Sequence, residues 1–160
     1  MRWFRKSSSS GFTFIELIVT TAVIMVLASA SLPIARVSIR RQKEAELRAT
    51  LREVRTAIDQ FKSYADQGRL STLELQAGNE GYPSSLDQMV EGVSAANDVT
   101  GKKYKFLRRI PIDPILGRAE WGLRAYADNP TSSAWGGGSV YDIYSKAEGK
   151  GLDGTKYKDW

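Results

Sequence analysis

The feature that most constrains this chain is an apolar run, Phe12–Ala35, in which Glu16 is the only charged side chain. A helix rises about 1.5 Å per residue, so this run spans about 36 Å and exceeds the roughly 30 Å hydrocarbon core of a bilayer. The run therefore predicts a transmembrane helix. A cleaved secretory signal peptide is the alternative, because Ala28-Ser29-Ala30 has the form of a signal-peptidase site behind a basic leader.

Three observations argue against the signal peptide. The apolar stretch before the site is longer than usual, it contains an acid, and the pattern beyond it stays helical. A carboxylate inside a membrane span is costly and usually has a partner. No lysine or arginine lies within one helical turn of Glu16. The nearest cation would be a free amine created by cutting the chain before Phe12, in the same chain or in a neighbouring copy. The alternative is an acid tolerated near the headgroups.

The segment Gly11–Leu17, with the sequence GFTFIEL, stands between a short basic leader and the apolar run. It resembles the class III signal of type IV pilins and of type II secretion pseudopilins. The resemblance implies cleavage by a prepilin peptidase between Gly11 and Phe12, N-methylation of Phe12, and a role in assembly for Glu16 as the fifth mature residue. Pro33 lies where this family often carries a helix-bending proline. Such a proline removes the hydrogen bond to the Ser29 carbonyl.

Beyond Arg36 the apolar residues recur at alternating intervals of four and three, which indicates a seam along one face of a helix. The seam comprises Leu47, Leu51, Val54, Ile58, Phe61 and then Tyr64 or Ala65. Glu44–Arg48 and Arg55–Asp59 are predicted pairs of opposite charge four residues apart. The seam covers less than three heptads, so we expect it to pack on the chain's own globular domain. Gly68 then predicts the helix end, which gives one helix of roughly 80 Å from Phe12 to about Asp66.

The remaining sequence predicts a short helix from the capping-box pattern at Ser84–Asp87 to about Val93, after a polar loop. Ser94–Gly101 is expected to be a linker. Three extended segments follow at Tyr104–Ile110, Trp121–Ala127 and Val140–Ser145. A long helix on a small antiparallel sheet is an α+β arrangement of the type IV pilin-like kind. The predicted divisions are a cleaved leader (1–11), a transmembrane and filament-core helix (12–35) and a globular domain (36–160), which contains an amphipathic helix half (36–66), a sheet (104–145) and a C-terminal loop (146–160).

Two C-terminal segments narrow the resemblance. Tyr104–Gly117, with the sequence YKFLRRIPIDPILG, is similar to the segment before the sheet in major pseudopilins of type II secretion. Tyr141–Ser145, followed by Asp153-Gly154-Thr155 and Asp159-Trp160, resembles their C-terminal end. The resemblance implies a non-enzymatic subunit that polymerises with itself into a periplasmic filament for protein secretion. It implies a single-pass anchor in the inner membrane, with the leader in the cytoplasm and the globular domain in the periplasm. Its partners would be a prepilin peptidase, minor pseudopilins and an inner-membrane assembly platform with an ATPase.

The sequence departs from the pseudopilin pattern in the closing loop. Major pseudopilins typically carry paired acids there that hold Ca²⁺, but the matching stretch Thr155–Asp159 has the sequence TKYKD. Cationic neighbours oppose the binding of a hard cation. Asp153, Asp159 and Glu148 remain weak candidates for a calcium site, and no other cofactor is expected. The alternative is that Lys156 and Lys158 supply the positive charge, for instance to Asp142, Glu148 or Asp153.

The chain lacks both Cys and His, which excludes disulfide scaffolds, thiolate zinc sites and Ser-His-Asp triads. No clustered nucleophile, base and oxyanion donor suggests catalysis. The basic and aromatic run Lys102–Arg109 could bind nucleic acid, but a half-buried strand with charges facing water is the preferred interpretation. The tryptophans Trp121, Trp135 and Trp160 are expected in the core rather than at an interface. A surface type IV pilin for adhesion, motility or DNA uptake, and a secreted soluble binding module, remain alternative functions.

Overall fold

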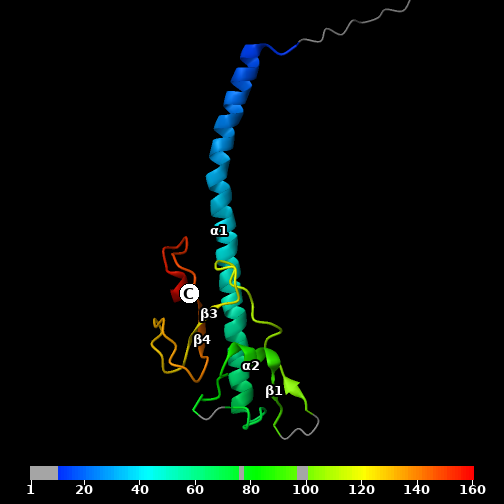
Figure 1. The fold of residues 1–160 in the computed structure, drawn as a ribbon, viewed down its shortest axis with the longest axis vertical. Helices are drawn as coiled ribbons and strands as arrows, with labels where there is room; N and C mark the ends of the chain where they lie inside the picture. The colour runs from blue at the N-terminus through cyan, green and yellow to red at the C-terminus, as the bar shows by residue number, and fades with distance from the viewer. Residues whose placement is uncertain (1–10, 76–77, 97–100) are drawn as a thin grey trace, which may run out of the picture. The chain divides into compact units, whose positions relative to one another are not determined.

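The computed structural model describes residues 11–75, 78–96 and 101–160, except for the side chains of residues 30–34. The chain divides into two compact units, Met1–Arg40 and Arg41–Trp160. We call the second unit the body. The elements in chain order are α1 (Phe14–Asp66), α2 (Leu86–Glu91), β1 (Val93–Ser94), β2 (Lys103–Tyr104), β3 (Trp121–Arg124), β4 (Asp142–Ser145) and the 3₁₀ helix η1 (Tyr157–Asp159) (Figure 1).

The long N-terminal helix is confirmed. Helix α1 ends in a Schellman motif, in which the Gly68 amide donates to the Ala65 carbonyl at 2.9 Å and the Arg69 amide donates to the Tyr64 carbonyl at 3.0 Å. Gly68 has a φ of +64°, a left-handed conformation that glycine adopts without a steric penalty. The sequence therefore places the helix end correctly.

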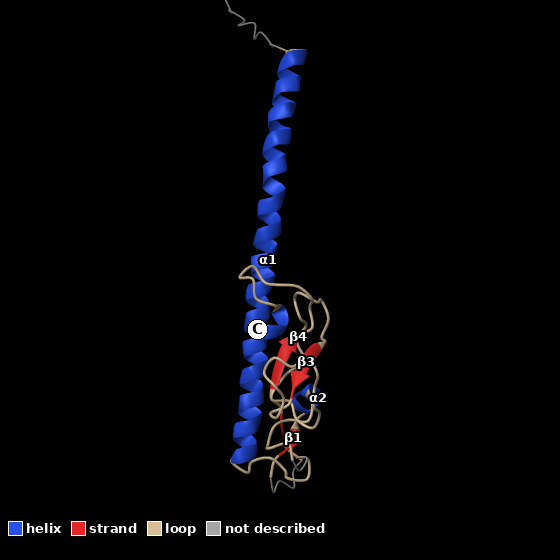
Figure 2. Cartoon of the chain, turned by 90° about the vertical axis from the view of Figure 1, so that its left-hand side faces the viewer, coloured by secondary structure: helices blue, strands red, loops and turns tan. Residues whose placement is uncertain are grey.

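The predicted seam of α1 forms the centre of the body's core. The side chains of Leu47, Val54, Ile58 and Phe61 have no exposed surface, and Leu51 is 2% exposed. The same cluster contains the following residues from the rest of the body: Leu70, Met89, Val93, Leu107, Trp121, Val140, Ile143 and Tyr157. Figure 2 shows the short strands and loops of the body lying along this part of α1. The body is thus an α+β arrangement built on one helix face, as predicted.

Helix α2 is shorter than expected, and its cap is displaced by one residue. Ser85, not Ser84, is the N-cap, and its hydroxyl accepts a hydrogen bond from the Gln88 amide at 3.2 Å. The Gln88 side chain accepts from the Ser84 amide at 2.8 Å. The side chain of Gln88, rather than that of Asp87, therefore accepts the hydrogen bond from the backbone ahead of the helix. The helix ends at Glu91 because the following residue, Gly92, leaves the helical conformation with a φ of +86°.

The prediction of one sheet is wrong, because the strands form two separate two-stranded sheets. Strands β1 and β2 form one antiparallel pair, and β3 and β4 form another, with Trp121 opposite Ser145 and Arg124 opposite Asp142. Strand β1 lies where a helix end and a linker were expected.

The predicted strand Tyr104–Ile110 is reduced to its first residue, which belongs to β2. The amides of Phe106 and Leu107 both donate to the Met89 carbonyl rather than to a neighbouring strand. The ring of Phe106 lies 5.1 Å from that of Phe61. Packing against α1 and α2 therefore replaces strand pairing in this segment.

Asp113 joins the segment before β3 to the end of β4. Its side chain is fully buried, and one carboxylate oxygen accepts from the amides of Ile115 and Leu116 at 2.8 and 3.0 Å. The other oxygen accepts from the Ser145 hydroxyl at 2.5 Å. A buried charge is tolerated where several donors satisfy it. Asp113 is therefore a structural residue that fixes the turn ahead of β3.

We expect residues 36–160 to be soluble, monomeric and folded on their own, because the α1 seam is covered by the same chain. Leu51→Asp places an unpaired carboxylate in the core and should destabilise this fragment by at least about 3 kcal/mol, enough to unfold a marginal domain. The matched control is Leu73→Asp, since Leu73 is 96% exposed. Thermal unfolding followed by circular dichroism measures both variants. A concentration-dependent oligomer in analytical ultracentrifugation, or an equally stable Leu51→Asp variant, would contradict this packing.

Candidate functional site

The Gly11–Leu17 motif forms the entry to α1. Thr13 caps the helix: its hydroxyl accepts from the Glu16 amide at 3.3 Å, and its carbonyl accepts from the Leu17 amide at 3.1 Å. Glu16 is thus the third helical residue, where a carboxylate interacts favourably with the helix dipole. This Thr-x-x-Glu spacing is that of a capping box. Glu16 therefore has a local role that the sequence analysis did not consider.

Gly11 is exposed, and its conformation does not require glycine. A Cβ atom built on Gly11 would have no heavy atom within 4 Å, and Gly11 does not have a positive φ. A Cβ atom at this position therefore fits without a clash against the described residues. If glycine is required at this position, the requirement comes from a molecule that binds the segment.

Most of the large apolar side chains that the structure describes in the first unit are exposed. Phe12 and Phe14 are each 79% exposed, and Ile15, Leu17, Val23, Ile24, Met25, Val26, Leu27 and Ile39 are all more than half exposed. These residues point in all directions around the helix, which is typical of a helix surrounded by apolar partners. The Glu16 carboxylate is also exposed, and it has no ion pair with any residue of the described part of the chain.

The structure leaves several predictions about this segment untested. The leader residues 1–10 and the side chain of Pro33 lie outside the described residues, so the leader and the proline bend remain predictions. Among the described residues, no helix has both the length and the apolar character required to cross a membrane. The predicted transmembrane role of residues 12–35 is therefore unconfirmed.

The closing loop, residues 146–160, contains the three predicted calcium ligands, and Asp153 already has other partners. One carboxylate oxygen of Asp153 accepts from the Thr155 amide at 2.9 Å and from the Thr155 hydroxyl at 2.6 Å. The other oxygen pairs with the guanidinium of Arg48. The hydrogen bonds from Thr155, followed by the ion pair with Arg48, lower the pKa of Asp153. Its charge is therefore satisfied without a metal.

The loop brings few carboxylates together for a calcium ion. Calcium binds six to eight oxygens, several of them from carboxylates. Glu148 and Asp159 are exposed, and across residues 11–75, 78–96 and 101–160 no three acidic side chains gather around one point. The described residues therefore place no cluster of carboxylates in the loop, and the expected absence of a calcium site stays a prediction.

Glu44 of α1 also binds the closing loop, and the sequence analysis assigned it to another pair. Its side chain is 8% exposed, its two carboxylate oxygens each accept from the Leu152 amide at 3.1 Å, and one accepts from the Tyr157 hydroxyl at 2.9 Å. The predicted Glu44–Arg48 pair does not form, because Arg48 pairs with Asp153. Both residues lie on the flank of α1 that faces the loop, so they meet partners distant in sequence.

A second ion-pair network fixes β4 and the chain end. Asp142 accepts from Arg55 at 2.7 Å and from Arg124 at 3.2 Å, so the predicted Arg55–Asp59 pair is also replaced. The Arg55 guanidinium additionally donates to the Trp160 carbonyl at 2.7 Å. The Arg124 guanidinium donates to the Lys158 carbonyl at 2.8 Å. Two arginines therefore join α1, the sheet and the closing loop.

These contacts correct the prediction that Lys156 and Lys158 supply positive charge to Asp142, Glu148 or Asp153. Arg48, Arg55 and Arg124 pair with Asp142 and Asp153 instead. The Lys158 ammonium lies 3.4 Å from the Ser133 hydroxyl. The planar guanidinium suits this role because it can bind a carboxylate and a backbone carbonyl at the same time. Strand alternation alone could not reveal that Arg124, only 5% exposed, points inward.

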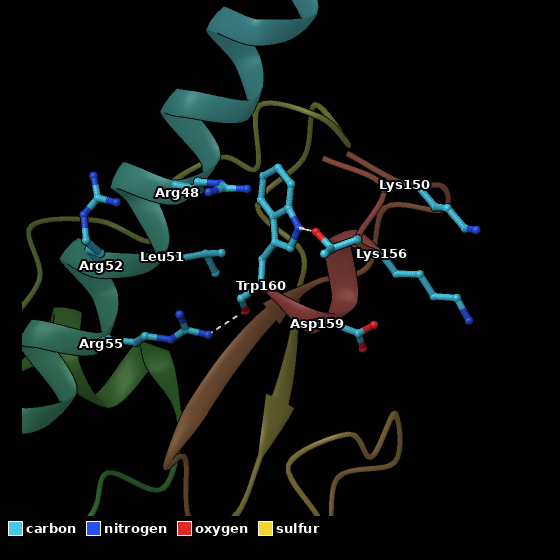
Figure 3. A pocket seen from close by; sticks show the side chains of 10 residues that line it. Arg48, Leu51, Arg52, Arg55, Lys150, Lys156, Asp159 and Trp160 are labelled. Carbon is cyan, nitrogen blue, oxygen red and sulfur yellow. Dashed lines mark hydrogen bonds between the residues drawn. The ribbon is translucent and has the colours of Figure 1, made fainter. Parts of the chain in front are cut away.

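A pocket of about 540 Å³ lies in the body between α1 and the closing loop (Figure 3). Its lining residues are Arg48, Leu51, Arg52, Arg55, Lys150, Gly154, Thr155, Lys156, Asp159 and Trp160. Five of these carry positive charge and one carries negative charge. The sequence analysis did not find this pocket, because its two walls are about a hundred residues apart in the sequence.

We expect a chelator to leave the melting temperature of the chain unchanged, because a metal can stabilise the folded state only where it binds. Arg124→Ala leaves Asp142 partly unpaired and should destabilise the chain by about 3 kcal/mol. Lys158→Ala is the matched control; it keeps the carbonyl that Arg124 binds and should change stability by less than about 0.5 kcal/mol. Calorimetry with EDTA and with added calcium measures these effects. A fall in melting temperature with EDTA that calcium reverses, and that Asp153→Ala abolishes, would show a calcium site.

The comparison with protein-family models matches residues 6–32 to the prokaryotic N-terminal methylation motif. The matched segment contains all of Gly11–Leu17 and most of the exposed apolar part of α1. Comparisons with curated proteins and with solved structures gave no match. The chain therefore carries the class III signal peptide of type IV pilin-like proteins, placed at the entry to a long helix that packs on small antiparallel sheets.

Proposed function

We propose that this chain is a structural subunit of a type II secretion pseudopilus. The observation that carries the proposal is the methylation motif at the head of a helix whose apolar side chains from Phe14 to Leu27 are largely exposed. Such a surface must be covered by lipid, by other helices, or by both in turn. A filament subunit has this requirement, because its helix is surrounded by lipid before assembly and by other helices after assembly.

In this proposal a prepilin peptidase cuts between Gly11 and Phe12 and methylates the new amine of Phe12. Residues 12–35 anchor the chain in the inner membrane with a single pass, and the body lies in the periplasm. An assembly platform with its ATPase then moves the subunit into the filament, in which minor pseudopilins are further partners. The chain itself performs no catalysis; the filament transmits mechanical work to protein export.

Glu16 has a defined part in the assembly. When helices 12–35 of adjacent copies pack together, the Phe12 amine and the Glu16 carboxylate enter an apolar core. An isolated charge in such a core is costly, whereas a paired amine and carboxylate partly compensate one another. The exposed carboxylate of Glu16 is free to take this role, because no residue of the described part of the chain forms an ion pair with it.

The resemblance of Tyr104–Gly117 and Tyr141–Ser145 to major pseudopilins favours secretion over a surface pilus. A surface type IV pilin is the second candidate, since it would use the same motif and the same helix. A null mutant of the chain separates the two: it should lose exported protein from the medium if the filament serves secretion. Loss of surface filaments with normal export would instead identify a surface pilin.

Gly11→Leu should leave the uncut precursor in the cell. Since a Cβ at Gly11 would meet no heavy atom of the described residues within 4 Å, we expect the substitution to spare the fold and to act on a peptidase subsite without room for it. Gly11→Ala, with its small side chain, is the graded control and should be cut more slowly. Immunoblotting separates precursor from mature chain. Normal cleavage of Gly11→Leu would refute processing at this site.

Glu16→Ala and Glu16→Gln should both be cut by the peptidase yet give few filaments, because neither can neutralise the Phe12 amine. The two variants separate charge from helix capping, since glutamine can replace glutamate in a capping box. Thr13→Ala is the capping control: it removes the hydroxyl that binds the Glu16 amide and should leave assembly largely intact. Cross-linking of the filament fraction measures the outcome. Normal filaments from Glu16→Gln would show that the carboxylate charge is merely tolerated.

A further inference from the structure

The pocket between α1 and the closing loop has a floor, which contains Trp160, and a rim of basic side chains. Figure 3 shows Arg48 pointing toward the ring of Trp160, with Leu51 beside them, while Arg52, Lys150 and Lys156 lie at the edges. Arg52 belongs to α1 and Lys156 to the opposite wall. The positive charges therefore stand on two sides of a central aromatic surface.

The floor is held in one conformation. The Arg48 guanidinium lies 4.1 Å from the centre of the Trp160 ring, and the Tyr157 ring meets Trp160 edge-on at 5.1 Å. The Trp160 indole donates to the Thr155 hydroxyl at 2.5 Å. A Cβ on Gly151 would lie 2.3 Å from the indole, so the ring rests directly on that glycine. Trp160 is thus preorganised, which reduces the entropy cost of binding a ligand.

The charge of the rim is only partly compensated. Asp153 pairs with Arg48, and Asp142 is shared between Arg55 and Arg124. Neither Arg52 nor Lys156 forms an ion pair or a side-chain hydrogen bond with the described residues. Asp159 is the acid that lines the pocket. The pocket therefore has a small excess of positive charge, suited to an anion carrying a few charges.

We propose that this pocket binds an acidic peptide segment of a partner protein. In the bound complex, carboxylates of the segment pair with Arg52 on one side and Lys156 on the other, and an apolar or aromatic side chain between them packs against the exposed part of Trp160. A guanidinium binds a carboxylate through two hydrogen bonds, which fixes the direction of the segment. A pocket of about 540 Å³ accommodates a few side chains. Tryptophan and arginine are also the residues that most often dominate binding energy at protein interfaces.

The acidic segment belongs to a different protein rather than to a second copy of this chain. No two acidic residues of the chain are adjacent in its sequence, and the nearest pair is Glu44 and Glu46. Glu44 is buried against the closing loop and cannot serve a neighbour. The chain therefore has no compact acidic segment to offer.

A nucleic acid fits the pocket less well than a peptide. A phosphate backbone requires a track of uncompensated positive charge, whereas two of the five cations here already pair with aspartates. The inference goes beyond the proposed function, because the pocket lies in the body and uses none of residues 12–35.

The test uses the full chain in nonionic detergent and a labelled pentapeptide, Asp-Glu-Trp-Glu-Asp, with fluorescence anisotropy as the readout. We expect saturable binding that weakens as salt increases, and binding at least about tenfold weaker for the neutral peptide Asn-Gln-Trp-Gln-Asn. Competition by inorganic phosphate and by a single-stranded oligonucleotide forms the second arm. A neutral peptide that binds equally well, or an oligonucleotide that displaces the peptide at lower concentration than unlabelled peptide does, would overturn the proposal.

Charge reversals locate the site. Arg52→Glu and Lys156→Glu should each weaken binding about tenfold. Lys43→Glu makes the same change at an exposed residue of α1 outside the pocket and should leave binding unchanged. Arg52→Lys keeps the charge and should retain most of the affinity, so a loss confined to Arg52→Glu with an unchanged circular dichroism spectrum reports the pocket. Unchanged binding in both reversals, or an equal loss in Lys43→Glu, would refute this location.

Discussion

The burial of the α1 seam against the rest of the body is the interaction on which the other features depend. The seam supplies the centre of a core to which short strands, loops and α2 each contribute one or two side chains. Strand pairs of two and four residues could not form a stable sheet alone. The helix therefore acts as the template of the body, and its flanks are left to bind the closing loop and to form the pocket.

Charge placement on α1 follows from this arrangement. Residues at the edge of the seam lie close to the closing loop, so Glu44, Arg48 and Arg55 pair with groups about a hundred residues away. Each of these contacts replaces a pair within the helix that would contribute only a few tenths of a kcal/mol. Together they close the loop through arginine, glutamate and backbone amides. The same contacts fix Trp160 and so shape the floor of the pocket.

The sequence predicted the parts that depend on local pattern. The intervals of the seam and the left-handed glycine at Gly68 determine where α1 runs and ends, because helix periodicity and capping are local properties. The methylation motif was recognised for the same reason. Strand lengths, the inward position of Arg124 and the pocket depend on long-range packing. Hydrophobic alternation does not encode which carboxylate an arginine will reach, and Asp142 became its partner only through the register of β3 and β4.

The central claim is that the chain is processed as a class III prepilin and then used as a filament subunit. The mass of the mature protein, isolated from cells that make it, tests that claim most directly. The account predicts a chain that begins at Phe12 and carries one methyl group on its amine. A chain that begins at Ser31, as cleavage by a signal peptidase would produce, would contradict it, because the motif and the exposed apolar helix would then be discarded with the leader.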